Sequence, residues 1–298
     1  MSQKSSKALI STGFVIFALV AAFFISHFGG DNDTKPTGIS VKDGDIMTVE
    51  FVDVGQGDCE FVELPDGKCM LIDSGEKYCA DMVEERIKNE GYTSIDYLVV
   101  THPHTDHMGG MSQIISDFDI GEIYMPYATS NTKTFEDMLE AIDSKGMTIN
   151  TAKAGVEIFF SEEITGEFLA PVGSDYDELN NYSAVLKLTY NDVSFLFTGD
   201  AEDISENEML ENSYSDLDAD VLKVGHHGSR YSTSDDFLNA VSPQYAVIEC
   251  GEDNKYGHPH SETIAKLESN GTEIYRTDLN GNITFVTDGI GIDISTQY

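Results

Sequence analysis

The stretch THPHTDH, residues 101–107, holds three histidines and an aspartate beside the end of a short apolar run that predicts a buried strand. One residue separates His102 from His104. Alternate side chains of an extended chain point the same way, so both imidazoles can reach one metal ion. Asp106 and His107 come where the chain is expected to turn into a helix. Their side chains diverge from the first pair and can serve a second ion nearby.

Seven of the eight histidines fall into three short clusters, each beside the end of a predicted strand. The second cluster is His226 and His227, and the third is His258 and His260. Random placement would scatter these side chains, so the clustering predicts a metal site. Asp200 also follows an apolar strand, and a carboxylate at that position can bridge two ions.

Charge and composition exclude several classes of protein. The 298 residues include 17 Lys+Arg and 53 Asp+Glu, which gives a formal net charge of −36. Such a chain cannot build a broad basic face for nucleic acid, and it is not expected to dock on anionic lipid through surface charge. The 40% hydrophobic content excludes wholesale disorder. The length suits one large domain or two small ones.

The N-terminal 30 residues form a separate segment. Lys4 and Lys7 precede an apolar run at 8–25, and about 20 helical residues cross a hydrocarbon core of ~30 Å. We expect residues 1–30 to be a single transmembrane helix, with the N-terminus in the cytoplasm and the rest of the chain outside the cell. A cleaved signal peptide, which would leave a secreted domain, is the alternative. The polar residues 31–45 predict a linker.

The remaining chain predicts an α/β architecture. Short strands come first in a block and then alternate with helices, and this alternation occurs twice. The pattern predicts two sheets that pack together and are covered by helices. The acidic run at 201–220 predicts a solvated helix and loop.

Five further motifs accompany THPHTDH: FVDVGQGD (51–58), LIDSG (71–75), FTGD (197–200), VGHHGS (224–229) and YGHP (256–259). Together they resemble the metallo-β-lactamase superfamily, in the branch that includes the hydrolase domain of the competence protein ComEC. Phosphorylcholine esterases of teichoic acid are relatives of this branch. The resemblance covers residues 46–298 and implies an αββα sandwich with a metal site at one edge of its two sheets.

The resemblance also implies a ligand set. His102 and His104 would bind the first ion, Asp106 and His107 the second, and Asp200 would bridge the two. A histidine of the second cluster would complete the second site. His226 is the expected ligand and His227 the alternative, since sequence cannot separate neighbours.

Other residues would support the ligands or act in catalysis. Asp73 would brace the histidine loop through hydrogen bonds, and Ser183 and Ser229 are expected to lie behind the ligands. Asp106 would also orient the attacking group. His227 and His258 would hold a substrate oxygen or protonate the leaving group.

One departure from the superfamily pattern concerns the first ion. The superfamily usually supplies a further histidine between the THPHTDH stretch and the bridging aspartate, but no histidine occurs between Met108 and His226. The stretch at 180–183, NNYS, takes that place. Fewer imidazoles favour an incomplete or oxygen-rich coordination. The sequence therefore does not decide between zinc and manganese, or between one ion and two.

The chemistry predicted from these residues is hydrolysis. A divalent ion lowers the pKa of bound water from about 15.7 toward about 7, and the resulting hydroxide can attack phosphorus or a carbonyl carbon. Lys223, Arg230 and Lys255 suggest an anionic substrate group such as phosphate, with scattered surface bases as the alternative reading.

The resemblance favours a phosphodiesterase or nuclease, with single-stranded DNA as a possible substrate and a DNA-uptake channel as a possible partner. The acidity fits better with the alternative, a hydrolase of a small or cell-wall phosphoester of the phosphorylcholine type. A non-catalytic binding module on the same fold is a third hypothesis. The missing histidine disfavours a β-lactamase.

Overall fold

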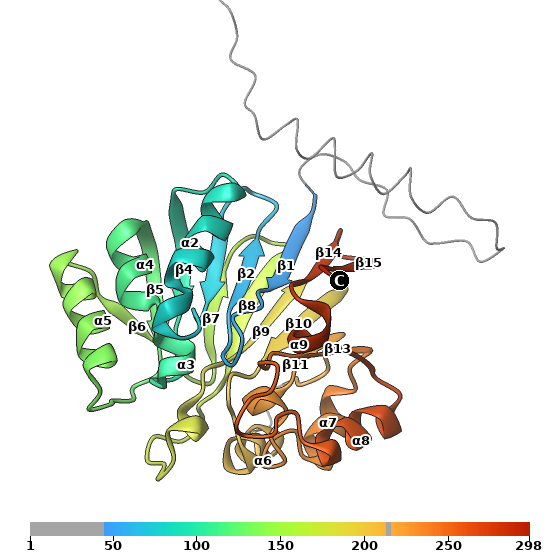
Figure 1. The fold of residues 1–298 in the computed structure, drawn as a ribbon. Coiled ribbons are helices and arrows are strands. Elements are labelled where there is room, and N and C mark those ends of the chain that lie inside the picture. The colour runs from blue at the N-terminus through green and yellow to red at the C-terminus, as the bar shows by residue number, and fades with distance from the viewer. Residues whose placement is uncertain (1–44, 213–215) are drawn as a thin grey trace, which may run out of the picture.

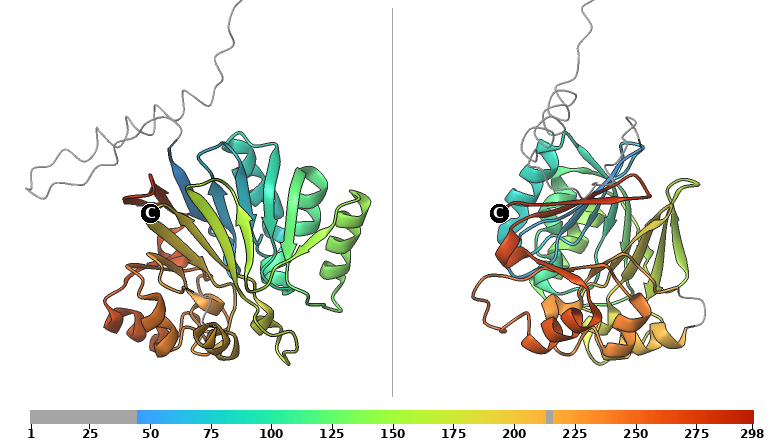
Figure 2. Two further views of the ribbon diagram at one scale, coloured as in Figure 1. Left: turned by 180° about the vertical axis from the view of Figure 1, so that it is seen from behind. Right: turned by 90° about the vertical axis from the view of Figure 1, so that its right-hand side faces the viewer.

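The structure, a computed structural model, describes residues 45–212 and 216–298. Two sheets pack face to face, and helices cover their outer faces (Figures 1 and 2). The predicted αββα sandwich is therefore confirmed. The expected membrane anchor at 1–30 and all but the last residue of the expected linker lie outside the described residues. Within the described part of the chain, no helix has the length and apolar character of a membrane span.

The first sheet has eight strands in the order β15-β14-β1-β2-β3-β4-β5-β6. In chain order they are β1 (Met47–Phe51), β2 (Glu60–Glu63), β3 (Cys69–Ile72), β4 (Ser94–Val99), β5 (Asp119–Met125), β6 (Ile149–Thr151), β14 (Ile283–Thr287) and β15 (Ile292–Thr296). Strands β3 to β6 run parallel to one another. The THPHTDH stretch follows β4 and so leaves the sheet at its carboxyl edge.

The second sheet has seven strands in the order β13-β12-β11-β10-β9-β8-β7. They are β7 (Val156–Phe159), β8 (Ile164–Ala170), β9 (Val185–Tyr190), β10 (Val193–Phe197), β11 (Val221–Lys223), β12 (Tyr245–Ile248) and β13 (Glu273–Arg276). Strands β10 to β13 are parallel, so their carboxyl ends meet at one edge, where open α/β sheets place their ligands. Asp200 follows β10, and His226 and His227 follow β11.

Helices of two groups cover the sheets. The elements α2 (Ala80–Asn89), α3 (Thr105–Met108), α4 (Met111–Asp117) and α5 (Lys133–Ser144) lie over the first sheet, and α6 (Asp203–Glu211), α7 (Asp235–Val241) and α8 (Ser261–Asn270) over the second (Figure 1). A short helix, α9 (Thr277–Asn280), follows β13, and 3-10 turns lie at η1 (Lys77–Cys79), η2 (Leu179–Tyr182) and η3 (Gly225–Gly228).

Local sequence explains these helices. In α5 the buried residues Phe135, Met138 and Ile142 recur at helical spacing, and the Thr132 side chain caps the first turn by accepting a hydrogen bond from the Phe135 backbone N–H. Gly271 ends α8 with a φ of 86°, which favours glycine. The apolar faces of the helices thus have a sheet to pack on.

The core has three apolar layers, one between the sheets and one under each group of helices. Between the sheets, Phe51 packs on Phe197 and Phe285, with ring centroids 6.0 and 5.7 Å away. All four cysteines are buried as free thiols.

The acidic run at 201–220 is only partly solvated. It forms helix α6 as expected, but Glu206 is buried beneath it. The Glu206 carboxylate accepts hydrogen bonds from the backbone N–H groups of Thr233 and Ser234, the latter at 2.8 Å. This carboxylate satisfies the backbone of the loop before α7, which the charge pattern alone could not reveal.

Candidate metal centre

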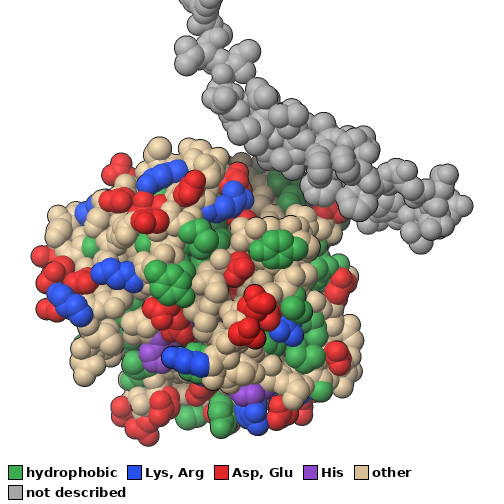
Figure 3. Space-filling model, in the orientation of Figure 1, with side chains coloured by type: hydrophobic (Ala, Val, Ile, Leu, Met, Phe, Trp, Pro, Cys, Tyr) green, Lys and Arg blue, Asp and Glu red, His purple; other side chains and the backbone are tan. Residues whose placement is uncertain are grey.

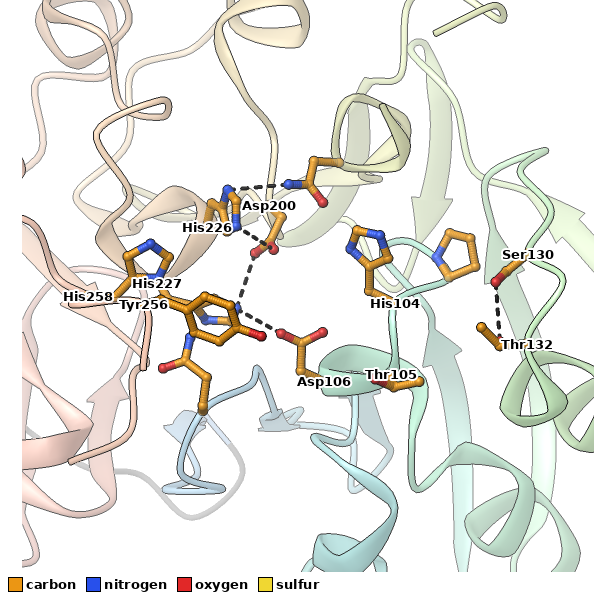
Figure 4. Close-up of a pocket in the computed structure, with 13 residues that line it drawn as sticks. His104, Thr105, Asp106, Ser130, Thr132, Asp200, His226, His227, Tyr256 and His258 are labelled. Atoms are coloured by element: carbon orange, nitrogen blue, oxygen red, sulfur yellow. Dashed lines mark hydrogen bonds and ion pairs between the residues drawn. The ribbon is translucent and has the colours of Figure 1, made fainter. Parts of the chain in front are cut away.

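The strand ends bring the clustered histidines and aspartates together at one edge of the sandwich. A cavity of about 360 Å³ opens there, lined by His104, Asp106, Asp200, His226, His227 and His258 among other residues. Figure 4 shows Asp200 at its centre, between His226 on one side and His104 on the other. Segments more than a hundred residues apart in the chain thus supply one site.

His102 and His104 face each other. His102 is fully buried, and its Nε2 lies 2.9 Å from Nδ1 of His104 and 3.9 Å from Oδ2 of Asp200. Burial lowers the pKa of His102 well below its ordinary value, so the ring is neutral, as a metal ligand must be. Two ring nitrogens and a carboxylate oxygen therefore form one donor group.

His107 lies between two carboxylates. Its Nδ1 is 2.7 Å from Oδ2 of Asp73, and its Nε2 is 3.2 Å from Oδ1 of Asp200. Asp73 also accepts hydrogen bonds from the backbone N–H and the hydroxyl of Thr101. Burial alone would lower the pKa of His107, but Asp200, Asp58 and Asp73 raise it well above the ordinary value. Asp73 thus occupies the bracing position that the resemblance implies.

His226 and His227 point to different sides of Asp200. The Nε2 atom of His227 lies 3.5 Å from Oδ2 of Asp106 and 3.6 Å from Oδ1 of Asp200. Its Nδ1 lies 2.9 Å from the Glu249 carbonyl oxygen, which can only accept a hydrogen bond. Burial alone would lower the pKa of His227, but Asp200 and Asp58 raise it to about 10. A ring that binds metal must be neutral, and this ring would then carry its proton on Nδ1 and leave Nε2 free for the ion.

His226 has different neighbours. Its Nδ1 lies 3.1 Å from Oε1 of Glu202, and its Nε2 lies 3.7 Å from Oδ2 of Asp200, on the other side of that carboxylate (Figure 4). Both histidines have a positive φ, 49° and 54°, in the turn after β11. Of the two neighbours that the sequence left open, the distances favour His227 as the ligand, beside Asp106 and His107.

The donor atoms fit a bound cation. His107 Nε2, His227 Nε2 and Asp200 Oδ1 are buried and have no hydrogen-bond partner among residues 45–212 and 216–298, and such an unpaired group costs about 1–3 kcal/mol. Two donor groups contain histidine, and in each the ligand atoms lie within 4.8 Å of one another. One has His102, His104 and Asp200, and the other has His107, Asp200, His227 and Asp58. Nitrogen and oxygen ligands of this kind suit zinc and other divalent ions. Asp200 belongs to both groups, as a bridging carboxylate must.

Ser183 and Ser229, which were expected behind the ligands, have different partners. The Ser183 hydroxyl accepts a hydrogen bond from the Asp200 backbone N–H at 3.1 Å and lies 3.4 Å from Nδ1 of His102, so it links two ligands. The Ser229 hydroxyl accepts instead from the Tyr231 backbone N–H and supports the loop after the histidine pair.

His258 lines the cavity without joining either donor group. Its ring centroid is 5.4 Å from that of His226 and 6.2 Å from that of His227. Burial, together with these two histidines, lowers the pKa of His258 to about 4, which keeps the ring neutral near pH 7. A neutral imidazole can hold a substrate oxygen through its N–H group.

The three bases that suggested an anionic substrate have other partners. Lys223 is fully buried, contacts the Asp58 carboxylate and donates to the Gly199 carbonyl oxygen at 3.2 Å, so it cannot touch a substrate in the cavity. Arg230 pairs with Glu262 at 3.0 Å. The Lys255 ammonium lies 4.9 Å from the centroid of the Tyr256 ring.

Sequence reasoning did not single out Asp58. Its carboxylate is fully buried, and Lys223 lowers its pKa against the effect of burial. It belongs to the FVDVGQGD motif, where an acid after a Gly-Gln-Gly turn beside an apolar strand was the available signal. Gly57 makes the position possible, because a Cβ there would lie 2.4 Å from the Asp106 carbonyl oxygen.

A family comparison agrees with this site. The model for the metallo-beta-lactamase superfamily matches residues 52–251. The chain belongs to the metallo-beta-lactamase superfamily. It is accordingly a metallo-hydrolase by family, and the matched region contains every residue of the two donor groups.

Among superfamily members, its curated relatives include competence proteins. The chain is 30% identical over 254 residues to ComE operon protein 3 of Bacillus subtilis, covering 80% of this chain and 32% of that protein. It is 30% identical over 234 residues to competence protein ComA of Neisseria gonorrhoeae, covering 78% and 31%. The chain thus spans about a third of the length of these relatives, and they support the ComEC-like branch.

Solved structures share the superfamily fold. Igni18, a metallo hydrolase from Ignicoccus hospitalis, superimposes with a TM-score of 0.52 at 16% identity, covering 80% of this chain and 98% of that one. CmlA, a diiron β-hydroxylase from Streptomyces venezuelae, gives 0.53 at 16% identity, covering 80% and 53%. At such identities the likeness concerns the fold alone.

Proposed function

We propose that this superfamily member is a metal-dependent phosphodiesterase of the ComEC-like type, with single-stranded DNA as its candidate polymer substrate. The observation that carries the proposal is the position of Asp200, whose two oxygens face two separate donor groups. Paired divalent ions suit phosphodiester hydrolysis because they stabilise both the attacking and the leaving oxygen. Zinc and manganese both fit the nitrogen and oxygen donors.

The residues of the cavity would act around such ions, which when bound supply positive charge to the phosphoryl group. Burial would raise the pKa of Asp106, but the neighbouring His227, whose Nε2 lies 3.5 Å from Oδ2 of Asp106, and the charge of His107 lower it. Asp106 therefore stays ionised and can accept a hydrogen bond from water in the cavity, which orients the attacking group. His258 is placed to hold a substrate oxygen.

Charge supports a second candidate, a hydrolase of a small or cell-wall phosphoester of the phosphorylcholine type. Binding a polyanion requires cations on the protein, but the chain carries a net charge of −36. No lysine or arginine is among the described residues that line the cavity. On the face seen in Figure 3, acidic side chains outnumber the basic ones that lie between them. A small ester with its own cationic group avoids this repulsion.

The third hypothesis, a non-catalytic module that uses the same fold for binding, has less support. A binding module has no need for buried, unpaired nitrogens and oxygens that converge on one point, and these are present at His107, His227 and Asp200.

We also propose that the chain is attached to the cell membrane through residues 1–30, with the hydrolase domain outside the cell, or is secreted if that segment is cleaved. A DNA-uptake channel is a candidate partner in the nuclease reading, because the competence proteins that resemble the chain are about three times as long as the matched region.

The deciding experiment measures hydrolysis of bis-p-nitrophenyl phosphate with added Mn²⁺ or Zn²⁺ by the wild type and by His104→Ala. Activity in the wild type that His104→Ala lacks supports a metallo-phosphodiesterase, whereas inactivity with every metal supports the binding module. Parallel assays with single-stranded oligonucleotides and with a choline phosphodiester separate the two hydrolase candidates. Cleavage of the choline ester alone would contradict the nuclease reading.

A further inference from the structure

A group of buried ionisable residues lies behind the two histidines of the second donor group, on the side away from Asp200. It consists of Asp58, Glu60, Lys223 and Glu249, which we call the buried charge cluster. All four are at most 1% exposed, and none of them lines the cavity. Ionisable side chains so far from water need a reason to be retained, because apolar residues of similar size are often no less stable in such places.

Asp58 connects this cluster to two metal-site histidines. Its Oδ1 lies 3.2 Å from Nδ1 of His227, and its Oδ2 lies 3.5 Å from Nδ1 of His107. The Nε2 atoms of the same two rings face Asp200, at 3.6 and 3.2 Å. Asp58 and Asp200 therefore lie on opposite sides of one pair of imidazoles. Among the described residues, Asp58 is the carboxylate with ion-pair contacts to Nδ1 of both rings.

This placement distinguishes Asp58 from a ligand. An imidazole binds metal through one nitrogen, while its other N–H group faces a carboxylate or carbonyl that fixes the ring. His107 has Asp73 in this role and His227 has the Glu249 carbonyl. Asp58 adds a contact common to both rings, on the side away from Asp200.

Lys223 holds Asp58 in place. Its ammonium contacts Oδ2 of Asp58 and donates to the Gly199 carbonyl oxygen at 3.2 Å. Gly199 immediately precedes Asp200, so one ammonium connects the carboxylate behind the imidazoles to the turn that carries the bridging carboxylate in front of them. A buried carboxylate that lost this cation would be strongly destabilised.

We propose that Asp58, clamped by Lys223, is a positioning carboxylate that fixes His107 and His227 in the orientation needed to bind a divalent ion. The inference rests on the proposed metal-dependent function and names the residues that make its second site rigid. It gives Lys223, which the sequence associated with substrate charge, a structural role behind the metal centre.

The test compares two variants that each change one buried carboxylate to an amide. Asp58→Asn removes the charge that faces the histidines. Glu60→Gln is the matched control, because Glu60 belongs to the same cluster but makes no ion pair or hydrogen bond to either histidine among those the structure records. Calorimetry measures the binding of Zn²⁺ and of Mn²⁺ alone to the metal-free full chain. The visible absorption spectrum and X-ray absorption of the Co²⁺-loaded protein report the geometry and the number of coordinated atoms.

We expect Asp58→Asn to bind metal about 10–100-fold more weakly than wild type, the usual effect of losing a partner behind a ligand, and Glu60→Gln to bind within about threefold. The Co²⁺ absorption bands should shift in Asp58→Asn while the number of coordinated atoms stays the same. Equal affinity in Asp58→Asn and Glu60→Gln would overturn the positioning role. Loss of one coordinated oxygen in Asp58→Asn would also overturn it, since Asp58 would then be a ligand.

A second variant, Asp58→Glu, provides a test in case Asp58→Asn does not fold. Asp58→Glu retains the charge that Lys223 needs but moves the carboxylate by one methylene. If Asp58→Asn does not fold, weaker binding by Asp58→Glu supports the proposal and wild-type affinity contradicts it. A wild-type chain that binds no divalent ion would instead contradict the proposed function itself, so the two failures can be told apart.

Discussion

Asp200 Oδ1 lies 3.2 Å from Nε2 of His107, and the opposite nitrogen of that ring lies 2.7 Å from Asp73. The imidazole is thus fixed by one carboxylate while it faces a second. Asp200 in turn reaches the donor group of His102 through its other oxygen, 3.9 Å away. This chain of contacts organises both halves of the candidate metal centre.

Removal of the shared carboxylate should affect both ions. We expect Asp200→Asn to lower metal affinity and hydrolytic activity by more than about 10–100-fold. That range is typical when a residue that only hydrogen-bonds to a ligand is lost. Metal content by mass spectrometry and phosphodiesterase rate check this. An Asp200→Asn protein that retains wild-type metal content would show that Asp200 does not bridge.

Loss of the Asp73 carboxylate behind His107 should lower metal affinity by less than loss of Asp200. Asp73→Asn should lower metal affinity about 10–100-fold, because the charge that faces His107 Nδ1 is lost. Backbone strain does not explain the loss, since Asp73 has a φ of 53° and asparagine tolerates that region. Calorimetric titration with Zn²⁺ is the measurement, and unchanged affinity would contradict the bracing role.

Alanine variants of the neighbouring His226 and His227 should differ in their metal content. His227→Ala is expected to lose the metal of the second site, since its Nε2 faces Asp106 and Asp200. His226→Ala should keep its metal content, because the His226 ring is held by Glu202 on the other side of Asp200. Metal stoichiometry of the two variants decides, and the reverse result would make His226 the ligand.

The pH dependence of stability should report on the buried charge cluster. Burial, with the nearby Asp58, raises the pKa of Glu249 from 4.5 to about 8. The folded state therefore binds this proton more tightly than the unfolded state, so the stabilisation from Glu249 is full below pH 4.5 and is lost as pH rises toward 8. In Glu249→Gln the free energy of unfolding of the metal-free chain should vary less over that range. Identical urea unfolding profiles across pH would contradict this.

The turn before Asp58 offers a backbone test. Gly57 has a φ of 154°, and a Cβ there would lie 2.4 Å from the Asp106 carbonyl oxygen. We expect Gly57→Ala to destabilise the fold by about 1–3 kcal/mol and to weaken metal binding. Gly67→Ala is the control, since Gly67 also has a positive φ, 83°, but no atom of the described residues lies within 4 Å of its Cβ position. Urea unfolding should separate the two variants.

The strand and helix pattern was largely readable from local sequence, because alternation and helical spacing depend on near neighbours. The strands at β1, β4, β9, β10, β11, β12 and β14 agree with the apolar runs of the chain. The prediction that the acidic run is solvated is wrong at Glu206. The Glu206 carboxylate is buried and accepts hydrogen bonds from backbone N–H groups of a loop that is distant in the sequence.

The residue types and spacing of THPHTDH, with the clusters around 226 and 258, by themselves predicted a metal site, because several imidazoles and carboxylates at strand ends can converge on one ion. The hydrolase fold was predicted from the resemblance of these motifs to a known superfamily. Tertiary structure alone decided how His226 and His227 divide around Asp200 and that Lys223 faces inward to Asp58. Both depend on where strands far apart in sequence end relative to one another, and no local pattern records that distance.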